Sequence, residues 1–285
     1  MSTAVVTPAV TSLADPDAGL RTGWRALLAA KRIDRVSLAL GLATAPVSIA
    51  VAETFLTVAL VVRLVGILRS RARPRPPRIF WFWLVWAGLE TSFWLFSLDR
   101  KAGWSEIRHL LLSAAMFFIL PALDRATDWL TVWKGIFLTS TLSALFLIGD
   151  FATRLIHYRR ELAVAFDPSL YLRSGGLLNH WMIFGAVEIM IVAGLISFWQ
   201  FFPESRRRWW PLVGIHGVAI VFSLTRMTWV ACFVLLAVHL AWRRSRWFWA
   251  LPALPLVLYL LVPSVVKTRV HESLKPGHYS NLERL

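Results

Sequence analysis

The chain alternates between long apolar blocks and short basic segments. The apolar blocks lie near residues 36–68, 79–98, 107–123, 129–149, 181–202, 210–224, 227–242 and 247–263. Most of them approach the roughly 17 to 25 residues that an α-helix needs to cross a hydrocarbon core of about 30 Å. Because lipid offers no partner for unpaired backbone groups, such blocks must be helices. The pattern therefore predicts an all-α fold, a polytopic transmembrane helical bundle.

The first block, 36–68, is too long for one crossing, because a straight helix over it would measure about 50 Å. Pro46 lies where a helix would break. Basic residues flank the block on both sides, and such flanks belong on the cytoplasmic side of a membrane. The sequence thus predicts a short helical hairpin bent near Pro46, with the N-terminus in the cytoplasm.

The same rule applies to the two blocks between residues 210 and 242. Arginine clusters at 206–208 and 243–246 enclose them, and both clusters are expected in the cytoplasm. The chain must then leave and return within about 32 residues, whereas two full crossings need roughly 40. The turn at Ser223-Leu224-Thr225-Arg226 is therefore expected below the outer membrane surface, in a polar cavity.

Together these anchors predict about nine crossings. Residues 1–20 are expected to be a disordered tail, and residues 21–263 a transmembrane domain with a periplasmic loop at 150–180. Within that loop, residues 154–162 are typical of an amphipathic segment lying on the membrane surface. Residues 264–285 are expected to begin a further periplasmic loop.

Composition agrees with a membrane protein. Hydrophobic residues make up 57% of the chain and charged residues 16%, against about 25% charged in soluble domains. Many of the 16 tryptophans lie at block edges, which is typical of an aromatic belt. The net charge of +15 is explained by topology and by membrane lipids as partners, not by nucleic acid, because the basic residues cluster between the blocks.

Signatures of soluble enzymes are absent from the sequence. It has no Gly-rich phosphate loop after a strand and no His-Glu-x-x-His motif. The single cysteine, Cys232, lies within an apolar block and excludes disulfides and Cys-based metal sites. We therefore expect no metal and no cofactor.

Arg226 is the most informative polar residue. An arginine near membrane depth costs roughly 2.5–3.5 kcal/mol, so a partner must offset it. That partner is an anionic ligand, an intramembrane acid or a set of backbone carbonyls, and the sequence leaves all three open. The acids available within apolar blocks are Glu53, Glu90 and Glu188. Their expected role is to hold arginines in place.

A second candidate segment runs from Tyr171 to Trp181 and opens the next helix. Arg173 supplies a planar, bidentate donor suited to phosphate. Gly175 and Gly176 would let the backbone approach a ligand closely. His180 is expected to cap the helix or lie at the interface rather than catalyse. The alternative is that Arg173 is an interfacial arginine beside a flexible hinge.

The end of the chain is basic and contains histidines. Its charged residues include Lys267, Arg269, His271, Lys275 and His278. The simplest interpretation is a solvated loop face, although the two histidines could act as general bases if this loop folds back over the site. Segments assigned to the periplasm thus carry a surplus of basic residues, which calls for an anionic partner such as a membrane-embedded phosphate or diphosphate.

These motifs resemble the O-antigen ligase/polymerase family of bacterial cell envelopes. The resemblance rests on Arg-x-Gly-Gly…Asn-His-Trp over 173–181 and on Ser-x-Thr-Arg over 223–226. Pro46 with the acid Glu53 is similar to that family's usual start, and Arg269 with the final Asn-Leu-Glu-Arg is similar to its later segments. The resemblance covers most of residues 36–285.

The resemblance implies a glycosyltransferase of the bacterial inner membrane. Such proteins move a glycan from an undecaprenyl-diphosphate carrier, at the periplasmic face, to lipid A core (ligases) or to another carrier-linked glycan (polymerases). Arg173 and Arg226 are the positions that would bind the diphosphate, and Glu90 is a supporting candidate together with Gly175, Gly176 and His180. The family is considered metal-independent.

One departure from the family leaves the catalytic residue unknown. Family members continue into a large periplasmic loop with a His-Pro…Gly-x-Gly type motif, whose histidine is the proposed base. This chain reaches Leu285 before any such motif. The resemblance therefore implies either a fragment of a longer protein, which is the favoured interpretation and puts that histidine beyond Leu285, or a protein that lacks part of the catalytic apparatus. Two alternatives stay open: a transporter or flippase of lipid-linked sugars, although the paired halves of many transporters are not evident, and a non-catalytic membrane assembly subunit.

Overall fold

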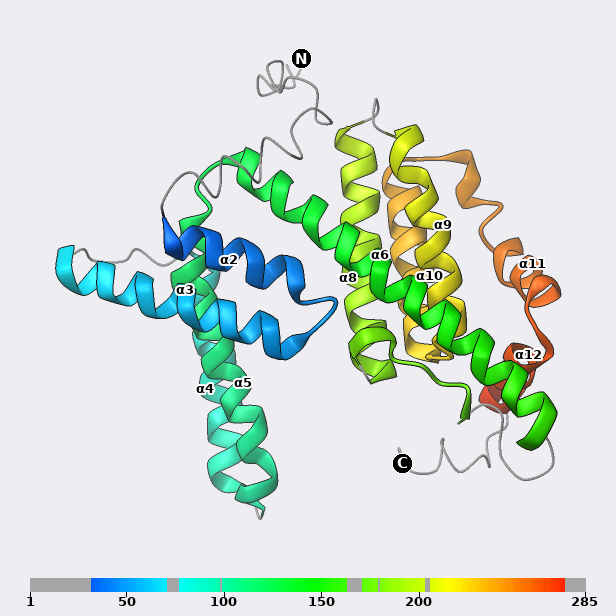
Figure 1. Cartoon of the computed structure of the whole chain (residues 1–285), viewed down its shortest axis with the longest axis horizontal. Helices are drawn as coiled ribbons and strands as arrows, with labels where there is room; N and C mark the ends of the chain where they lie inside the picture. The colour runs from blue at the N-terminus through cyan, green and yellow to red at the C-terminus, as the bar shows by residue number, and fades with distance from the viewer. Residues whose placement is uncertain are drawn as a thin grey trace. The chain divides into compact units, whose positions relative to one another are not determined.

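The structure is a computed structural model that describes residues 32–70, 77–97, 99–162, 171–178, 180–202 and 206–274. Every regular element in these ranges is a helix (Figure 1). Four helices are long and apolar enough to cross a membrane, namely Ile49–Arg69, Ile79–Phe96, Ala126–Arg160 and Trp181–Phe201. Shorter apolar helices cover Ser113–Ala122, Trp209–Phe222 and Arg226–Trp242. These helices indicate a membrane protein, in agreement with the sequence.

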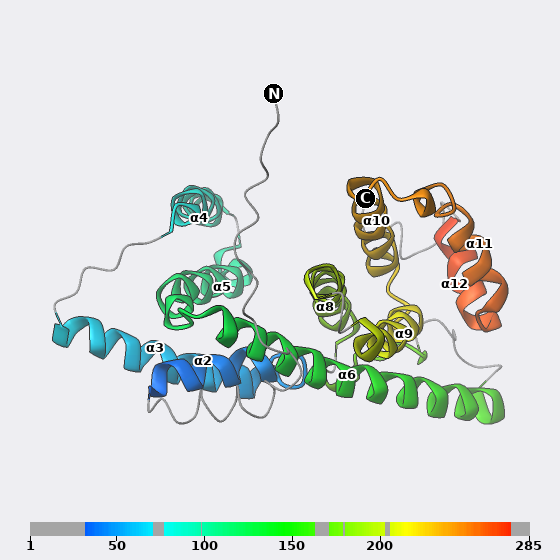
Figure 2. The same cartoon turned by 90° about the horizontal axis from the view of Figure 1, so that it is seen from above.

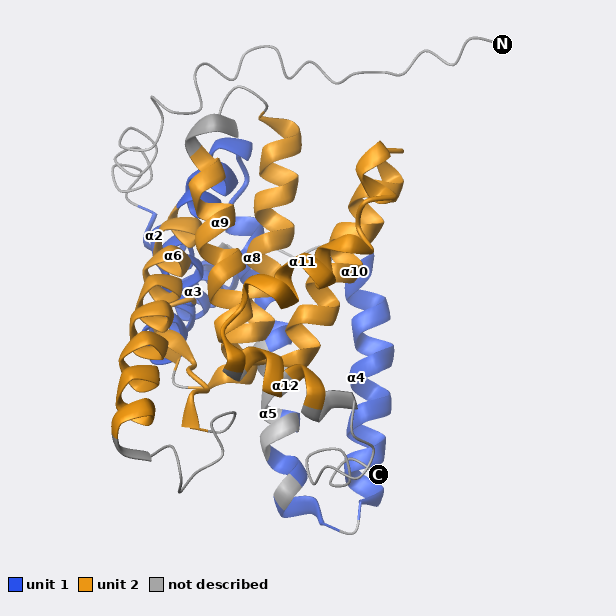
Figure 3. Cartoon of the chain, turned by 90° about the vertical axis from the view of Figure 1, so that its right-hand side faces the viewer, with its two compact units in different colours: residues 1–45, 49–134 blue, residues 46–48, 135–285 orange. Residues whose placement is uncertain are grey.

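The chain divides into two compact units (Figure 3). Unit 1 comprises residues 1–45 and 49–134, and unit 2 comprises residues 46–48 and 135–285. The predicted tail at 1–20 and the residues after 274 lie outside the described residues.

Unit 1 contains the predicted hairpin. Helix α2 (Ile33–Thr44) packs against α3 (Ile49–Ser70), and the chain turns between them around Pro46. Helices α4 (Ile79–Phe96) and α5 (Arg100–Ile119) form a second antiparallel pair, followed by the short η1 (Leu120–Ala122). The hairpin is confirmed as a pair of helices, but α2, with 12 residues, measures about 18 Å and is shorter than the hydrocarbon core.

Ion pairs join the start of α2 to the first turn of α6 and the residues just before it. Arg35 pairs with the buried Asp128 of α6, and it also lies 3.8 Å from a carboxylate oxygen of Asp124. Asp34 in turn contacts Arg63 of α3, with 3.8 Å between the charged atoms. Asp124 and Asp128 are thus partners of Arg35, which belongs to a basic flank that is predicted to be cytoplasmic.

Helix α6 (Ala126–His157) is the longest element, with 32 residues. It continues into a π-helical turn, η2 (Tyr158–Leu162). Residues 154–162, expected as an amphipathic segment on the membrane surface, thus prolong a helix that begins before the apolar block, and their place at that surface stays a prediction. A transmembrane helix and an amphipathic helix that follows it both have helical periodicity. The sequence therefore did not show that the two form one continuous helix.

Three antiparallel helices form the centre of unit 2. They are α8 (Trp181–Phe201), α9 (Arg206–Phe222) and α10 (Arg226–Trp242). They run alongside one another in Figure 1, and Figure 2 shows α9 beside α6. The predicted break between the blocks at 210–224 and 227–242 is confirmed, since only residues 223–225 separate α9 from α10. A buried core of Ala144, Leu147, Leu178, Phe184 and Ala219 joins α6, α8 and α9.

The last apolar block does not form the continuous helix that was predicted over 247–263. A short turn, η5 (Arg246–Phe248), precedes α11 (Ala253–Leu261), which has nine residues. Pro252 precedes the first residue of this helix and Pro255 lies in its first turn, where a missing backbone N–H removes no helical hydrogen bond. Pro263 follows the end of the helix, because the residue before a proline disfavours the helical conformation. Helix α12 (Ser264–Leu274) comes next.

Candidate functional site

The turn between α9 and α10 is held from both sides. Ser223 is buried, and its hydroxyl donates to the carbonyl of Ile220 (2.8 Å) and accepts from the backbone N–H of Thr225 (3.3 Å). Leu224 has φ of +52°, a left-handed conformation uncommon outside glycine. Its side chain is 1% exposed. Core packing thus fixes a strained turn, and Arg226 is the first residue of α10.

A buried cluster, here called the Leu224 cluster, joins this turn to three other segments. Its members are Phe151, Leu172, Leu224 and Val266. They come from α6, from the segment that leads into α8, from the α9–α10 turn and from α12 respectively. The cluster therefore gathers to one end of unit 2 the two segments in which the sequence predicted diphosphate-binding arginines.

Trp181 connects the two predicted arginines. The guanidinium carbon of Arg173 lies 5.2 Å from the centre of the Trp181 ring, within the range of a cation–π interaction. The hydroxyl of Thr225 donates to the Trp181 carbonyl over 3.5 Å, and Arg226 follows Thr225 in the chain. Both arginines are partly exposed. Arg173 and Arg226 thus lie at the two ends of a short chain of contacts.

Two further basic residues lie beside the Leu224 cluster. Arg154 donates to the carbonyls of Tyr171 and Arg173, each over 3.4 Å, and its Nε lies 2.8 Å from Asp150. Lys267 follows Val266, and its ammonium group donates to the carbonyl of Leu260 over 3.3 Å. Sequence reasoning singled out Lys267 only as part of a basic tail and gave Arg154 no role. A sequence signal for Arg154 was available, because it lies four residues after Asp150, a spacing that favours an ion pair on a helix.

The predicted glycines have different surroundings. Gly176 has φ of +57°, and a Cβ there would lie 2.8 Å from Ser143 Oγ and 3.0 Å from a carbon of Phe184. The same hydroxyl accepts from the backbone N–H of Leu177 over 3.2 Å. The close approach at Gly176 is therefore to α6. Gly175 is buried, and its carbonyl accepts from the N–H of Leu178 over 3.1 Å.

His180 caps α8, as expected. Its Nδ1 accepts from the backbone N–H of Met182 over 3.3 Å, which satisfies one of the free donors at the helix start. Its ring stacks on Trp181 with centroids 4.6 Å apart. A histidine in this position orders the residue that Arg173 and Thr225 both contact.

Glu188 does not hold an arginine, the role that the sequence suggested. It is 1% exposed, and its carboxylate lies 2.6 Å from Nδ1 of His216. The expectation that Glu188 pairs with an arginine is thus wrong. Glu53 and Glu90 are exposed, and their expected role stays a prediction.

The pair of Glu188 and His216 forms a buried polar network within apolar helices. Nε2 of His216 lies 3.3 Å from the hydroxyl of Thr141 and 3.5 Å from that of Ser140. The network links α6, α8 and α9. Sequence reasoning missed His216, although a lone histidine inside the apolar block 210–224 was a signal, because ionisable groups at membrane depth need partners.

Helices α8 and α10 approach each other closely next to this region. A Cβ on Gly185 would lie 2.2 Å from the hydroxyl oxygen of Thr228 and 3.4 Å from Cγ2 of Thr225. Small residues allow such contact between membrane helices. Gly185 therefore lets α10 lie near enough to α8 for Thr225 to reach the Trp181 carbonyl.

The histidine-containing tail is described in part. His271, on α12, lies 2.9 Å from the hydroxyl of Tyr259 through Nε2 and is exposed. Lys275 and His278 lie outside the described residues, and of Arg269 the structure describes only the backbone. Val266 of α12 joins the Leu224 cluster, so this segment folds back onto unit 2.

No protein-family model matches the chain, and comparison with curated proteins and with solved structures gives no significant match. Among the residues that the structure describes, no group of three or more His, Cys, Asp or Glu side chains is placed to hold a metal ion.

Proposed function

We propose that this chain is a membrane glycosyltransferase of the O-antigen ligase/polymerase type. It would move a glycan from an undecaprenyl-diphosphate carrier to lipid A core or to a glycan acceptor. In this proposal the protein crosses the bacterial inner membrane about nine times, with its N-terminus in the cytoplasm and the Leu224 cluster towards the periplasm. Arg173 and Arg226 bind the diphosphate, and the histidine that activates the acceptor lies beyond Leu285.

The observation that carries the proposal is the convergence of basic residues on the Leu224 cluster. Phe151, Leu172, Leu224 and Val266 come from four segments, and a basic residue follows each of them by one to three positions. These basic residues are Arg154, Arg173, Arg226 and Lys267. A diphosphate is an anion that guanidinium and ammonium groups bind through charge-assisted hydrogen bonds, which supports a diphosphate as the ligand at this end of unit 2.

The chemistry of the transfer suits this arrangement. When the glycan leaves its carrier, negative charge develops on the diphosphate oxygen that is released. Guanidinium donors that are already fixed in place stabilise this charge without reorganising. The Arg173 guanidinium lies over the Trp181 ring, and Arg226 is the first residue of α10, which supports such a role.

Binding of the carrier tests this proposal directly. Undecaprenyl diphosphate is titrated against the purified full chain, and lipid-bound species are counted by native mass spectrometry. Arg173→Ala and Arg226→Ala should each weaken binding about tenfold or more, since each removes a charge-assisted pair of hydrogen bonds. Arg246→Ala removes the same charge beyond the opposite end of α10 and serves as the matched control.

Lysine variants refine the test. Arg173→Lys and Arg226→Lys keep the charge but lose the planar fork, so they should bind the carrier more weakly than the wild type. Undiminished binding in both alanine variants, or an equal loss in the Arg246→Ala control, would refute a specific diphosphate site.

A second candidate function rests on the buried pair of Glu188 and His216. Ionisable groups at membrane depth often serve as proton relays in transporters, so a proton-coupled flippase of lipid-linked sugars is the alternative. In proteoliposomes, a flippase would move a fluorescent lipid-linked sugar across the bilayer in response to a pH gradient, and Glu188→Gln would abolish that movement. A transferase would show no such movement.

A further inference from the structure

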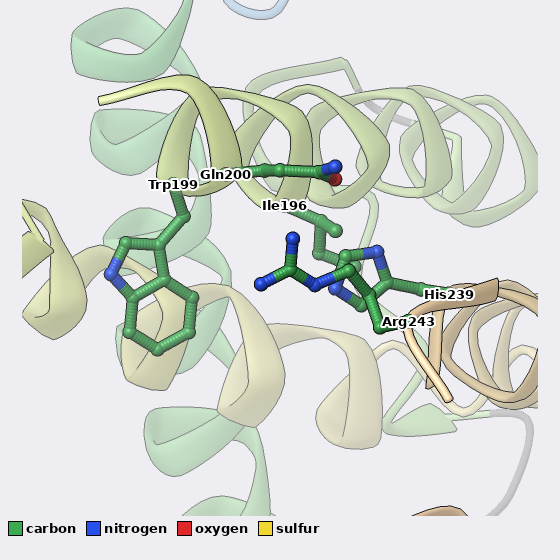
Figure 4. A pocket seen from close by; sticks show the side chains of 5 residues that line it. All are labelled: Ile196, Trp199, Gln200, His239 and Arg243. Atoms are coloured by element: carbon green, nitrogen blue, oxygen red, sulfur yellow. The ribbon is translucent and has the colours of Figure 1, made fainter. Parts of the chain in front are cut away.

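A cavity of about 190 Å³ lies between the ends of α8 and α10 that are remote from the Leu224 cluster (Figure 4). Its lining residues are Ile196, Trp199, Gln200, His239 and Arg243. Arg226 starts α10 and Arg243 caps its end, so roughly 25 Å of helix separates this cavity from the proposed diphosphate site. The cavity is a distinct site.

The polar groups of this cavity are suited to an anion. Figure 4 shows the Arg243 guanidinium extending into the space between Trp199 and Gln200, with the His239 ring beside it. Arg243 and the Gln200 amide are N–H donors, and His239 can donate through either ring nitrogen. None of the lining residues is acidic, and no ion pair among the described residues involves Arg243.

The helix ends themselves weigh against an anion, because carbonyl groups there carry partial negative charge. The backbone N–H of Arg243 bonds to the carbonyls of His239 and Ala241 and thereby satisfies part of this charge. The Arg243 guanidinium adds a full positive charge at the same helix end. An anion in the cavity therefore meets a net excess of donors.

The position and size of the cavity identify the kind of anion. It opens where two apolar helices end, beside Trp199 and near Trp242, which is 83% exposed. Tryptophans favour the headgroup level of a bilayer. The cavity is smaller than the roughly 300–1,000 Å³ of sites that enclose a whole drug-sized ligand. It fits one polar group of a larger molecule whose apolar part lies elsewhere.

We propose that this cavity binds the phosphate of an anionic phospholipid. Arg243 and Gln200 hold the phosphate oxygens, His239 supports Arg243, and the acyl chains lie along the exposed apolar faces of α8 and α10. Exposed side chains on these faces include Met190, Val230, Val234 and Val238. Basic pockets between membrane helices commonly take such headgroups.

The test measures lipid retained by the purified full chain in native mass spectrometry. Phosphatidylglycerol and phosphatidylcholine are offered separately to the wild type, to Arg243→Gln and to Arg246→Gln. Arg246 is exposed and lies three residues further along, so it is the charge-matched control. Arg243→Gln should reduce phosphatidylglycerol binding about fivefold, and Arg246→Gln should leave it nearly unchanged.

Two further arms separate the remaining outcomes. Gln200→Leu keeps all charges and should also weaken phosphatidylglycerol binding, because it removes an amide donor. This variant tests the proposal if Arg243→Gln fails to fold. Excess inorganic phosphate should not displace the lipid, because it lacks the acyl chains. The proposal is overturned by equal retention of phosphatidylcholine, by equal losses in the two arginine variants, or by displacement with phosphate alone.

Discussion

Gly176 shows how one residue fixes the segment that carries Arg173. Its φ of +57° lies in the left-handed region, and the missing Cβ leaves room for Ser143 of α6. The adjacent N–H of Leu177 then reaches the hydroxyl of Ser143. Conformation and packing therefore require glycine at the same position, for independent reasons.

Gly176→Ala should accordingly destabilise the protein by about 1–3 kcal/mol, because it combines backbone strain with overpacking. The matched control is Gly149→Ala on α6, where a Cβ would meet nothing within 4 Å and where alanine improves helix propensity. The apparent melting temperature in detergent should fall for the first variant and stay equal or rise for the second. Equal melting temperatures would show that the segment shifts freely.

At the scale of elements, the contact between α8 and α10 decides where the two predicted arginines lie. Gly185 brings the helices together, and the hydrogen bond from Thr225 to the Trp181 carbonyl joins their N-terminal ends. Membrane helices gain no hydrophobic driving force from one another, so packing of small residues and interhelical hydrogen bonds must supply the attraction. The relative position of Arg173 and Arg226 therefore depends on two small residues, Gly185 and Thr225.

Gly185→Ala tests this dependence, because its Cβ would lie 2.2 Å from the hydroxyl oxygen of Thr228. We expect a lower melting temperature and weaker binding of undecaprenyl diphosphate. Thr228→Ala in the same chain removes that oxygen, and both quantities should recover in part. If the double variant is no better than Gly185→Ala alone, the two residues do not form the critical contact.

The sequence predicted the parts of the fold that depend on local hydrophobicity. An apolar block at 79–98 became α4 over Ile79–Phe96, and one at 181–202 became α8 over Trp181–Phe201. Such blocks specify helices because lipid excludes other backbone structures. Where prolines interrupt the block, as at Pro252 and Pro255, the length of the block overestimated the helix.

Contacts between residues on different helices could not be predicted from the sequence. Glu188 pairs with His216 across 28 positions, and no periodicity connects two residues on different helices. Hydropathy placed both within apolar blocks but gave no register between the helices. For the same reason the hydrogen bonds of Arg154 to the carbonyls of Tyr171 and Arg173 could not be anticipated.

At the scale of the molecule, the two ends of the α8–α10 hairpins differ in chemistry. One end carries Arg173 and Arg226 beside the Leu224 cluster, and the other carries the cavity with Arg243. Helices α8 and α10 connect these ends. If both helices cross the bilayer, the two sites face opposite compartments.

Labelling of single cysteines checks this arrangement. In a Cys232→Ser background, Ala152→Cys marks the end of α6 near Arg154, and Ser245→Cys marks the end of α10 near Arg243. A membrane-impermeant maleimide added to intact cells should label position 152 and not position 245, and permeabilised cells should label both. Labelling of position 245 in intact cells would show that the predicted topology is wrong.

Helix α6 has one consequence for the lipid environment. Its 32 residues measure about 48 Å, and a tilt within the usual range of 0–40° cannot fit that length into a hydrocarbon layer of about 30 Å. The end of the helix that bears Arg154 must then project into the headgroups. Longer acyl chains would thicken the bilayer and draw this arginine inward, together with the carbonyls that it holds. The geometry around Arg173 would thus respond to bilayer thickness.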